Sequence, residues 1–218
     1  MRPLLRGLLA VVLSVSAAAC SAKDSAGFEE GKQYKKVMAV QPPSDPKRIS
    51  VEEFFWYGCP HCYAFDPDIN KWLKTKPADV DFIRVPNSLG HPQGLLHSKA
   101  FYTAEALQLY PQLHTVLFDA IHKDNLPMNT QEQIGQVFAK AGGVKPDVFA
   151  GTFNSFVVEA QVNKAEQLAR TYGVISVPTI IVGGKYMTSV QMAGGHDQTL
   201  TVINQLVDKI RQERGLKK

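Results

Sequence analysis

The fold of this chain is decided by residues 49–62, which read ISVEEFFWYGCPHC. The first part is mostly apolar and β-prone, which predicts a buried strand that leads into a turn at Gly58. Helical spacing follows the second cysteine, so a helix is expected over 59–74 with Cys59 at its N-terminus. Unpaired backbone N–H groups and the positive end of the helix dipole favour an anion there. A cysteine thiolate is such an anion.

Two thiols on one helical turn are suited to disulfide exchange, which needs an attacking thiolate, a resolving thiol and access for a second protein. Cys59 is predicted to be the exposed attacking sulfur and Cys62 the more buried resolving one. Pro60 and His61 separate them, and His61 can add positive charge or a hydrogen bond near the Cys59 sulfur. Because a stabilised thiolate stabilises the reduced form, the closed disulfide would be a strong oxidant.

Two other uses of such a cysteine pair are a buried structural disulfide and half of a zinc site. Zinc would need two further Cys or His ligands at suitable spacing. No two of the remaining histidines stand three to five residues apart. The sequence therefore favours redox chemistry at the cysteine pair, with no metal and no bound cofactor. The remaining histidines are His91, His97, His114, His122 and His196.

Composition indicates an ordinary globular protein. The chain has 218 residues, of which 44% are hydrophobic and 20% charged, enough for one domain with a full core and a large insertion. The formal net charge of +4 includes Arg2 and Arg6, and removing both leaves 22 basic against 20 acidic residues. This balance does not indicate a nucleic-acid binder.

Residues 1–19 are predicted to be a signal peptide. Arg2 and Arg6 supply positive charge, residues 8–15 are apolar, and residues 16–19 are small. The apolar stretch is too short for a stable membrane anchor. We therefore expect export from the cytoplasm to a compartment where disulfides persist.

Cys20 follows three alanines at 17–19, which resembles a bacterial lipobox, where lipid is attached to the cysteine and cleavage occurs just before it. Ala17 departs from that pattern, in which an aliphatic residue such as leucine is usual. The alternative is ordinary cleavage at the same bond, which would leave a free N-terminal cysteine. Lipidation of Cys20 is favoured because a spare thiol would invite mispairing. Residues 20–33 would then be a tether.

The segment around the cysteines is a strand, helix, strand unit. Strands are expected over 48–55 and 79–85, on either side of the helix at 59–74. This order implies a parallel pair of strands with a right-handed crossover.

Further along, the pattern becomes helical over 97–170, too long for an ordinary connection. Strand signals return at 178–182 and 185–187, and a final helix is expected over 197–211. The sequence thus predicts an α/β framework interrupted by a helical block. We divide the mature chain into a first framework part at 34–96, an inserted helical domain at 97–170 and a second framework part at 171–218.

Glu53 is a carboxylate in an otherwise apolar strand, six residues before Cys59. If it is buried beneath the motif, it can take or relay the proton of Cys62. The alternative is an outward-facing carboxylate, because strand alternation is expected to put one of Glu52 and Glu53 outward.

The motifs together resemble the DsbA family, the bacterial periplasmic thiol:disulfide oxidases. The resemblance covers nearly the whole mature chain. It rests on EFF at 53–55, CPHCY at 59–63, NSFVV at 154–158, VP at 177–178 and GGKY at 183–186.

This resemblance implies a thioredoxin fold with an inserted helical domain. It also implies a cis peptide bond between Val177 and Pro178, where incoming substrate would be contacted, although the residues alone favour a trans proline at a strand start. Glu53 would be the buried acid, and Arg84 its basic partner.

The resemblance also implies partners. The oxidised Cys59–Cys62 pair would accept electrons from reduced, newly exported proteins and be recharged by a DsbB-type quinone-linked membrane oxidase. An apolar groove beside Cys59 and Pro178 is expected to bind unfolded chains, with Phe65 and Met192 as candidate lining residues. We expect a monomer in the periplasm, anchored to a membrane if Cys20 is lipidated.

Two alternative functions stay open at this point. A disulfide isomerase or reductase could use the same scaffold, although isomerases usually add a dimerisation domain and there is no room for one before Arg48. A copper-binding chaperone could use Cys59 and Cys62 as soft ligands. It would be expected to carry extra Met or His residues close by.

Overall fold

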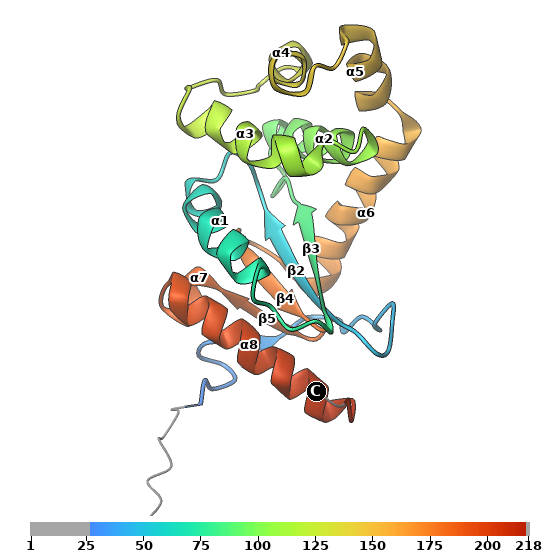
Figure 1. The fold of residues 1–218 in the computed structure, drawn as a ribbon. Helices are drawn as coiled ribbons and strands as arrows, with labels where there is room; N and C mark the ends of the chain where they lie inside the picture. Colours follow the sequence, from blue (N-terminus) through green and yellow to red (C-terminus); the bar gives the residue numbers. More distant parts are fainter. Residues whose placement is uncertain (1–26, 217–218) are drawn as a thin grey trace, which may run out of the picture.

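The computed structural model describes residues 27–216 (Figure 1). The predicted signal peptide, Cys20 and the first part of the tether lie outside the described residues. Within the described part, no helix is long and apolar enough to cross a bilayer. The helices are α1 (Pro60–Leu73), α2 (Pro92–Ala106), α3 (Tyr110–His122), α4 (Gln131–Gly142), α5 (Pro146–Phe153), α6 (Phe156–Tyr172), α7 (Val190–Ala193) and α8 (His196–Glu213).

The strands form one mixed sheet in the order β1-β5-β4-β2-β3. The parallel pair β2 and β3 is joined by α1, as the strand, helix, strand pattern predicts. β4 is antiparallel to β2, and Gly183 and Gly184 turn the chain back into β5. The strands are β1 (Lys35–Lys36), β2 (Ile49–Phe55), β3 (Val80–Pro86), β4 (Thr179–Val182) and β5 (Tyr186–Ser189).

Helices cover both faces of this sheet (Figure 1). α1 and α8 pack on one face, over Ile49, Val51 and Val182. The C-terminal half of α6 packs on the other face, where the ring of Tyr172 meets Phe54 edge-on at a centroid distance of 5.9 Å. A strand that is buried on both faces needs an almost continuous apolar run, which explains the composition of β2.

The two neighbouring glutamates of β2 are both buried, so the expectation that one of them points outward is wrong. Glu52 is 8% exposed and Glu53 is 2% exposed. Glu53 interacts with Arg84 below α1, whereas Glu52 interacts with Tyr172 of α6 on the opposite face. The expectation assumed that only one face of the sheet is covered, but α6 covers the second.

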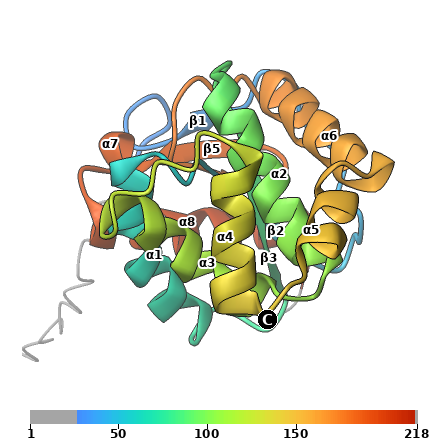
Figure 2. The same ribbon diagram turned by 90° about the horizontal axis from the view of Figure 1, so that it is seen from above.

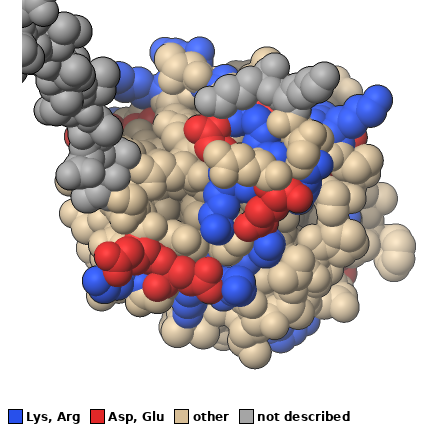
Figure 3. All heavy atoms as spheres, turned by 90° about the horizontal axis from the view of Figure 1, so that it is seen from below, with Lys and Arg blue, Asp and Glu red and all other residues tan. Residues whose placement is uncertain are grey.

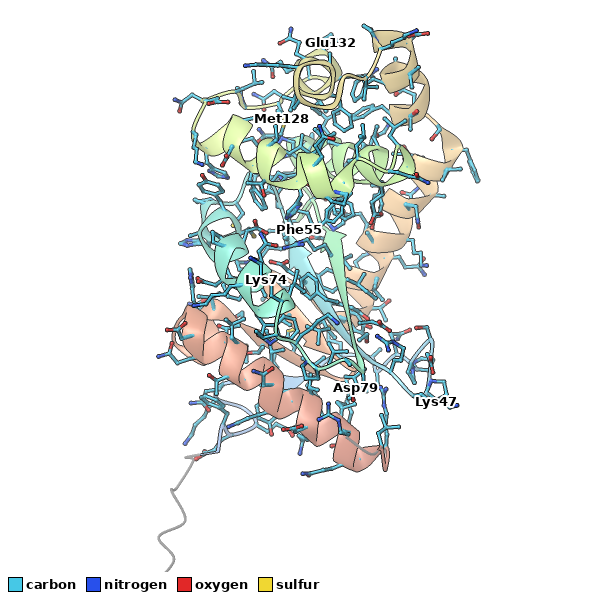
Figure 4. The ribbon with its side chains drawn as sticks, in the orientation of Figure 1. Lys47, Phe55, Lys74, Asp79, Met128 and Glu132 are labelled. Atoms are coloured by element: carbon cyan, nitrogen blue, oxygen red, sulfur yellow. The ribbon has the colours of Figure 1, made fainter. Side chains whose placement is uncertain are left out.

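Helices α2 to α5 form a layer above the carboxyl ends of β2 and β3 (Figures 1 and 2). Phe55 ends β2 and enters this layer, as Figure 4 shows. Its ring centroid lies 5.6 Å from that of Phe101 and 5.5 Å from that of His114. Met128, in the loop before α4, is fully buried in the same apolar cluster. The strand that leads to the cysteines is therefore anchored in the core of the helical layer.

Local signals explain where α4 and α6 begin. Thr130 caps α4 by accepting a hydrogen bond from the backbone N–H of Gln133 at 3.3 Å. Ser155 caps α6 by accepting from the backbone N–H of Val158 at 3.3 Å. Much of the NSFVV stretch at 154–158 thus serves to start a helix.

The face opposite the helical layer carries both signs of charge. Figure 3 shows Lys and Arg side chains interspersed with Asp and Glu side chains over this face. Asp79, at the lower end of the sheet in Figure 4, pairs with Arg211 at 2.9 Å. This mixed surface agrees with the small net charge and does not resemble a basic nucleic-acid platform.

We predict that Phe55→Ala lowers the free energy of unfolding by about 3–5 kcal/mol, because it leaves a cavity where β2 meets the helical layer. Phe156→Ala is the matched control, since Phe156 is 86% exposed; its effect should stay within about 0.5 kcal/mol. Urea unfolding measures both. Equal losses would contradict the assignment of Phe55 to the shared core.

Candidate active site

The chain passes from β2 to α1 through a tight turn. The backbone N–H of Cys59 donates to the carbonyl oxygen of Trp56 at 2.9 Å. A Cβ on Gly58 would lie 2.6 Å from the Trp56 ring, so the turn needs glycine. The indole N–H of Trp56 donates to Nδ1 of His97 at 2.9 Å, and its ring stacks on His91 at 5.7 Å. These contacts fix the backbone that presents the first cysteine.

Cys59 lies at the N-cap of α1, and Pro60 begins the helix, where its missing N–H costs no hydrogen bond. The expectation that Cys59 is exposed is wrong, because only 9% of the residue is exposed, although it is less buried than Cys62. Its Sγ–H donates to the carbonyl oxygen of Val177 at 3.5 Å. The hydrogen bond from Cys62 lowers the pKa of Cys59 to about 6, against the effect of burial. The backbone N–H groups of Cys62 and His61 and the charge of the exposed His61 side chain act in the same direction.

The pKa of Cys62 is shifted in the opposite direction from that of Cys59. It is fully buried, and burial raises its pKa well above that of an ordinary thiol. The neighbouring Cys59 and the charge of Glu53 raise it further. Both cysteines are free thiols in this structure. The lowered pKa of Cys59 means that the folded protein favours its thiolate. The pair therefore combines a stabilised outer thiolate with a protonated inner thiol.

A groove of about 510 Å³ lies beside the motif. The Val177–Pro178 peptide bond at its wall is cis, which confirms what the family resemblance implies. The expectation that Phe65 lines this groove is wrong. Phe65 belongs to α1 and is fully buried in the core between α1 and the sheet. Met192 is not among the lining residues either. The groove is lined by His61, Ser176, Val177, Pro178, Ser189, Val190, Gln191 and His196.

Glu53 and Arg84 face each other on neighbouring strands, with Arg84 Nε donating to Glu53 Oε2 at 3.1 Å. Arg84 also donates through Nη2 to Asp66 of α1 at 2.8 Å and through Nη1 to the hydroxyl of Tyr110 at 2.6 Å. Burial raises the pKa of Glu53 to about 7, although the charge of Arg84 opposes this. One guanidinium is thus shared by two carboxylates beneath Cys62.

The sequence reasoning missed several members of this buried network. His114 of α3 donates through Nε2 to Asp66 Oδ1 at 3.0 Å, and its Nδ1 lies 2.9 Å from the hydroxyl of Tyr57. His122, on the same helix, bonds to the carbonyl oxygen of Tyr57 at 2.8 Å and stacks on Tyr63. Asp66 could have been suspected, because it follows Cys62 by one helical turn.

All six histidines of the chain gather around residues 56–68, although they are dispersed in the sequence. His97 and His91 hold Trp56, and His196 donates through Nδ1 to Asp68 at 2.7 Å. No local spacing predicts this, because α2, α3 and α8 are brought together only by the fold. Even so, residues 27–216 contain no group of three or more His, Cys, Asp or Glu side chains that could hold a metal ion.

The mixed sheet, the CxxC pair at a helix N-terminus and the adjacent cis proline define a thioredoxin-fold protein of disulfide exchange. A family model described as "DSBA-like thioredoxin domain" matches residues 50–206. The chain belongs to this family and is a thiol:disulfide oxidoreductase.

Curated relatives match over nearly the whole chain. The thiol:disulfide interchange protein DsbA of Pseudomonas syringae is 39% identical over 202 residues, covering 93% of this chain and 94% of the relative. DsbA of Pseudomonas aeruginosa is 38% identical over 211 residues, covering 97% of this chain and 98% of the relative.

Solved structures agree with this assignment. The crystal structure of Pseudomonas aeruginosa DsbA superposes with a TM-score of 0.80 at 39% identity, covering 86% of this chain and 97% of that one. The oxidoreductase DsbA of Xylella fastidiosa gives a TM-score of 0.78 at 29% identity, covering 85% of this chain and 98% of that one.

We predict that Cys59 in the reduced protein titrates near pH 6, as followed by thiolate ultraviolet absorbance. Cys62→Ala should raise this pKa toward the ordinary thiol value, because the Ala side chain donates no hydrogen bond. Cys62→Ser is the matched control, since its hydroxyl keeps a donor and should hold the pKa lower.

The sign of the pH effect follows from the lowered pKa. The Cys59 thiolate stabilises the reduced fold fully above the pKa of an unfolded thiol, and this contribution is lost as the pH falls through about 6. Identical titration of Cys59 in both variants and the parent would contradict the assigned role of Cys62.

Proposed function

We propose that the oxidised Cys59–Cys62 pair donates its disulfide to reduced, newly exported proteins in the periplasm. The observation that carries this proposal is the opposite tuning of the two thiols, with the pKa of Cys59 lowered and that of Cys62 raised. Stabilising the thiolate of one partner makes the reduced form favourable, so the closed pair is a good electron acceptor.

In the proposed exchange, a client thiolate attacks the Cys59 sulfur. A client–Cys59 disulfide forms, and the Cys59–Cys62 bond breaks with its electron pair going to Cys62, which takes up a proton. A second client thiolate then attacks the client sulfur of the mixed disulfide, and Cys59 leaves as a thiolate. A thiol of low pKa is a good leaving group. The low pKa of Cys59 therefore favours its release from the mixed disulfide and the transfer of the disulfide to the client.

We propose the groove beside Val177 and Pro178 as the client site. The Sγ of Cys59 lies against the Val177 carbonyl, so a chain that lies in the groove passes the reactive sulfur. Ile175, just before the groove, is 86% exposed and offers an apolar contact for unfolded chains. Such contacts need no defined client sequence.

Glu53 is proposed as the proton relay for Cys62. A carboxyl group with a pKa of about 7 can both accept and give a proton near neutral pH. In client oxidation it would supply the proton that the Cys62 sulfur takes up; in reoxidation it would remove that proton. Arg84 acts as the acid's partner, because it holds the Glu53 side chain in place and limits the rise in its pKa.

The DsbA family works through a redox-active disulfide, and we propose that this chain also needs no further cofactor.

For reoxidation of the Cys59–Cys62 pair, we propose a DsbB-type quinone-linked membrane oxidase, on the strength of the family resemblance. Lipid attachment at Cys20 would keep the protein at a membrane, and the intact mass of protein extracted from cells tests it.

The copper-chaperone and isomerase alternatives gain no support from the relatives, which are named thiol:disulfide interchange proteins.

We predict that the oxidised protein converts a reduced two-cysteine peptide to its disulfide in a one-to-one reaction. Cys62→Ser, challenged with a peptide disulfide, should accumulate a mixed disulfide at Cys59, because nothing resolves it. Cys59→Ser should form none, since Cys62 is buried. Intact mass spectrometry reads both. A mixed disulfide on Cys59→Ser alone would reverse the assigned roles.

We also predict that Glu53→Gln slows the Cys62-dependent step of reoxidation by roughly 100-fold or more, because loss of a general base typically costs about 100- to 10,000-fold. In the parent this step should accelerate as the pH rises through about 7, where Glu53 ionises, and the variant should lose that acceleration. Stopped-flow reoxidation by a peptide disulfide at several pH values measures it.

Glu52→Gln is the matched control for this test. Glu52 is the preceding residue and is also buried, but it lies on the opposite face against Tyr172. Its pH profile should match the parent. A relay role for Glu53 is excluded if the two variants give the same pH profile.

A further inference from the structure

Asp66 stands in the buried network around Arg84, but the relay proposed above gives it no task. It belongs to α1, four residues after Cys62, and is 5% exposed. Its Oδ1 accepts hydrogen bonds from Arg84 Nη2 at 2.8 Å and from His114 Nε2 at 3.0 Å. Its Oδ2 accepts from the side-chain amide of Asn70 at 2.7 Å. A buried carboxylate that receives three hydrogen bonds keeps its negative charge.

Glu53 is held by fewer groups. Within residues 27–216, the one hydrogen bond found for its carboxylate comes from Arg84 Nε at 3.1 Å. Burial raises the pKa of Glu53 to about 7. Burial acts on Asp66 in the same direction, but its bond to His114 and the charge of Arg84 outweigh it, so the pKa of Asp66 is lowered. Glu53 is therefore the carboxylate of the two that can exchange a proton near neutral pH.

The position of Arg84 makes the two carboxylates depend on each other. Its guanidinium presents Nε to Glu53 and Nη2 to Asp66, while Nη1 donates to the hydroxyl of Tyr110. The Arg84 side chain is only 6% exposed, so water screens these charges weakly. Loss of the negative charge of Asp66 would remove a like charge from Glu53 and leave the positive charge of Arg84 to act on Glu53 alone. Both changes favour the ionised form of Glu53.

The titratable groups that face Glu53 and its partner come from three elements. They are Arg84 of β3, Asp66 and Cys62 of α1, and Tyr110 and His114 of α3. Burial raises the pKa of Cys62 and of Tyr110 and lowers that of His114, so these three are uncharged near pH 7. The neighbouring strand β4 pairs with Glu53 through Ile180 and contains no titratable residue. α8 packs on the same face of the sheet with apolar side chains.

We propose that Asp66 is a positioning residue, which holds part of the charge of Arg84 and thereby sets the pH range in which Glu53 exchanges a proton with Cys62. This proposal rests on the proposed relay role of Glu53. Without the charge of Asp66, Glu53 would stay ionised well below neutral pH. It would then be a weaker base toward a buried thiol, because the efficiency of a general base follows its pKa.

In reoxidation by a peptide disulfide, the proton moves in one direction. The Cys62 S–H bond breaks and its proton goes to Glu53. The Cys62 sulfur attacks the Cys59 sulfur of the mixed disulfide, and the Cys59–Cys62 bond forms. The electron pair of the broken bond goes to the peptide sulfur, which leaves as a thiolate, and Glu53 then releases the proton to solvent. Asp66 and Arg84 keep their charges throughout.

The test titrates Glu53 directly, by infrared absorption of its carboxyl group in the reduced protein. Its band is identified as the one lost in Glu53→Gln. The midpoint should lie at about 7 in the parent. Asp66→Asn should lower it by at least about one pH unit, because a nearby charge shifts a carboxyl pKa by about 1–3 units.

The same variant should change the pH profile of the Cys62-dependent step, measured by stopped flow from the mixed disulfide. The ratio of the rates at pH 8 and pH 6 should fall from about tenfold to about twofold or less, as the ionised fraction of a single acid predicts for these midpoints. A merely structural role of Asp66 would change the rates at both pH values alike.

Three further variants separate charge from packing. Asp66→Glu keeps the charge although it disturbs the packing, and should hold the midpoint near the parent value. Asp66→Ser removes the charge with a smaller side chain and should reproduce the shift even if Asp66→Asn folds poorly. Asp68→Asn removes a half-exposed carboxylate of the same helix, which bonds to His196, and should leave both readouts unchanged.

A Glu53 midpoint that stays at the parent value in both Asp66→Asn and Asp66→Ser would overturn the proposal. The same shift in Asp66→Glu would also overturn it, because packing rather than charge would then be the cause. An infrared midpoint that moves while the kinetic ratio stays unchanged would contradict the relay role of Glu53 in the proposed function and would still support the effect of Asp66 on its ionisation.

Discussion

The chemistry of the site depends on one interaction, in which the thiol of Cys62 stabilises the thiolate of Cys59 at the start of α1. It is the largest influence on the pKa of Cys59, and it exists only because the two cysteines stand on the first turn of a helix. β2 brings the chain to this point, and Gly58 and Trp56 hold the turn. The outer sulfur is thus stabilised as an anion by groups of the chain itself.

Beneath this pair lies a buried ionic network that holds several layers together. Arg84 of β3 is shared between Glu53 of β2 and Asp66 of α1, and His114 ties Asp66 to the helical layer. Burying charges costs more desolvation energy than surface pairs do, so such a network is weak evidence for stability. The network also reaches the fully buried Cys62, because the charge of Glu53 raises the pKa of that thiol.

Local pattern was enough to predict the parts that are set by neighbouring residues. The β2–α1–β3 unit and the two strands near the C-terminus follow from the hydrophobic period. The burial of Glu52 was not predictable in this way, because it depends on α6 returning to the sheet from more than a hundred residues away in the chain. The histidines around the active site have no common spacing, and only the helix packing brings them together.

The most direct test of the account is the equilibrium between the Cys59–Cys62 disulfide and glutathione, measured as a function of pH. Each 30 mV in reduction potential corresponds to about 1.4 kcal/mol for two electrons. The account predicts that glutathione reduces the disulfide readily and that the pH dependence changes slope near pH 6, where Cys59 ionises. A disulfide that resists glutathione, with its change of slope at the pKa of an ordinary thiol, would contradict it.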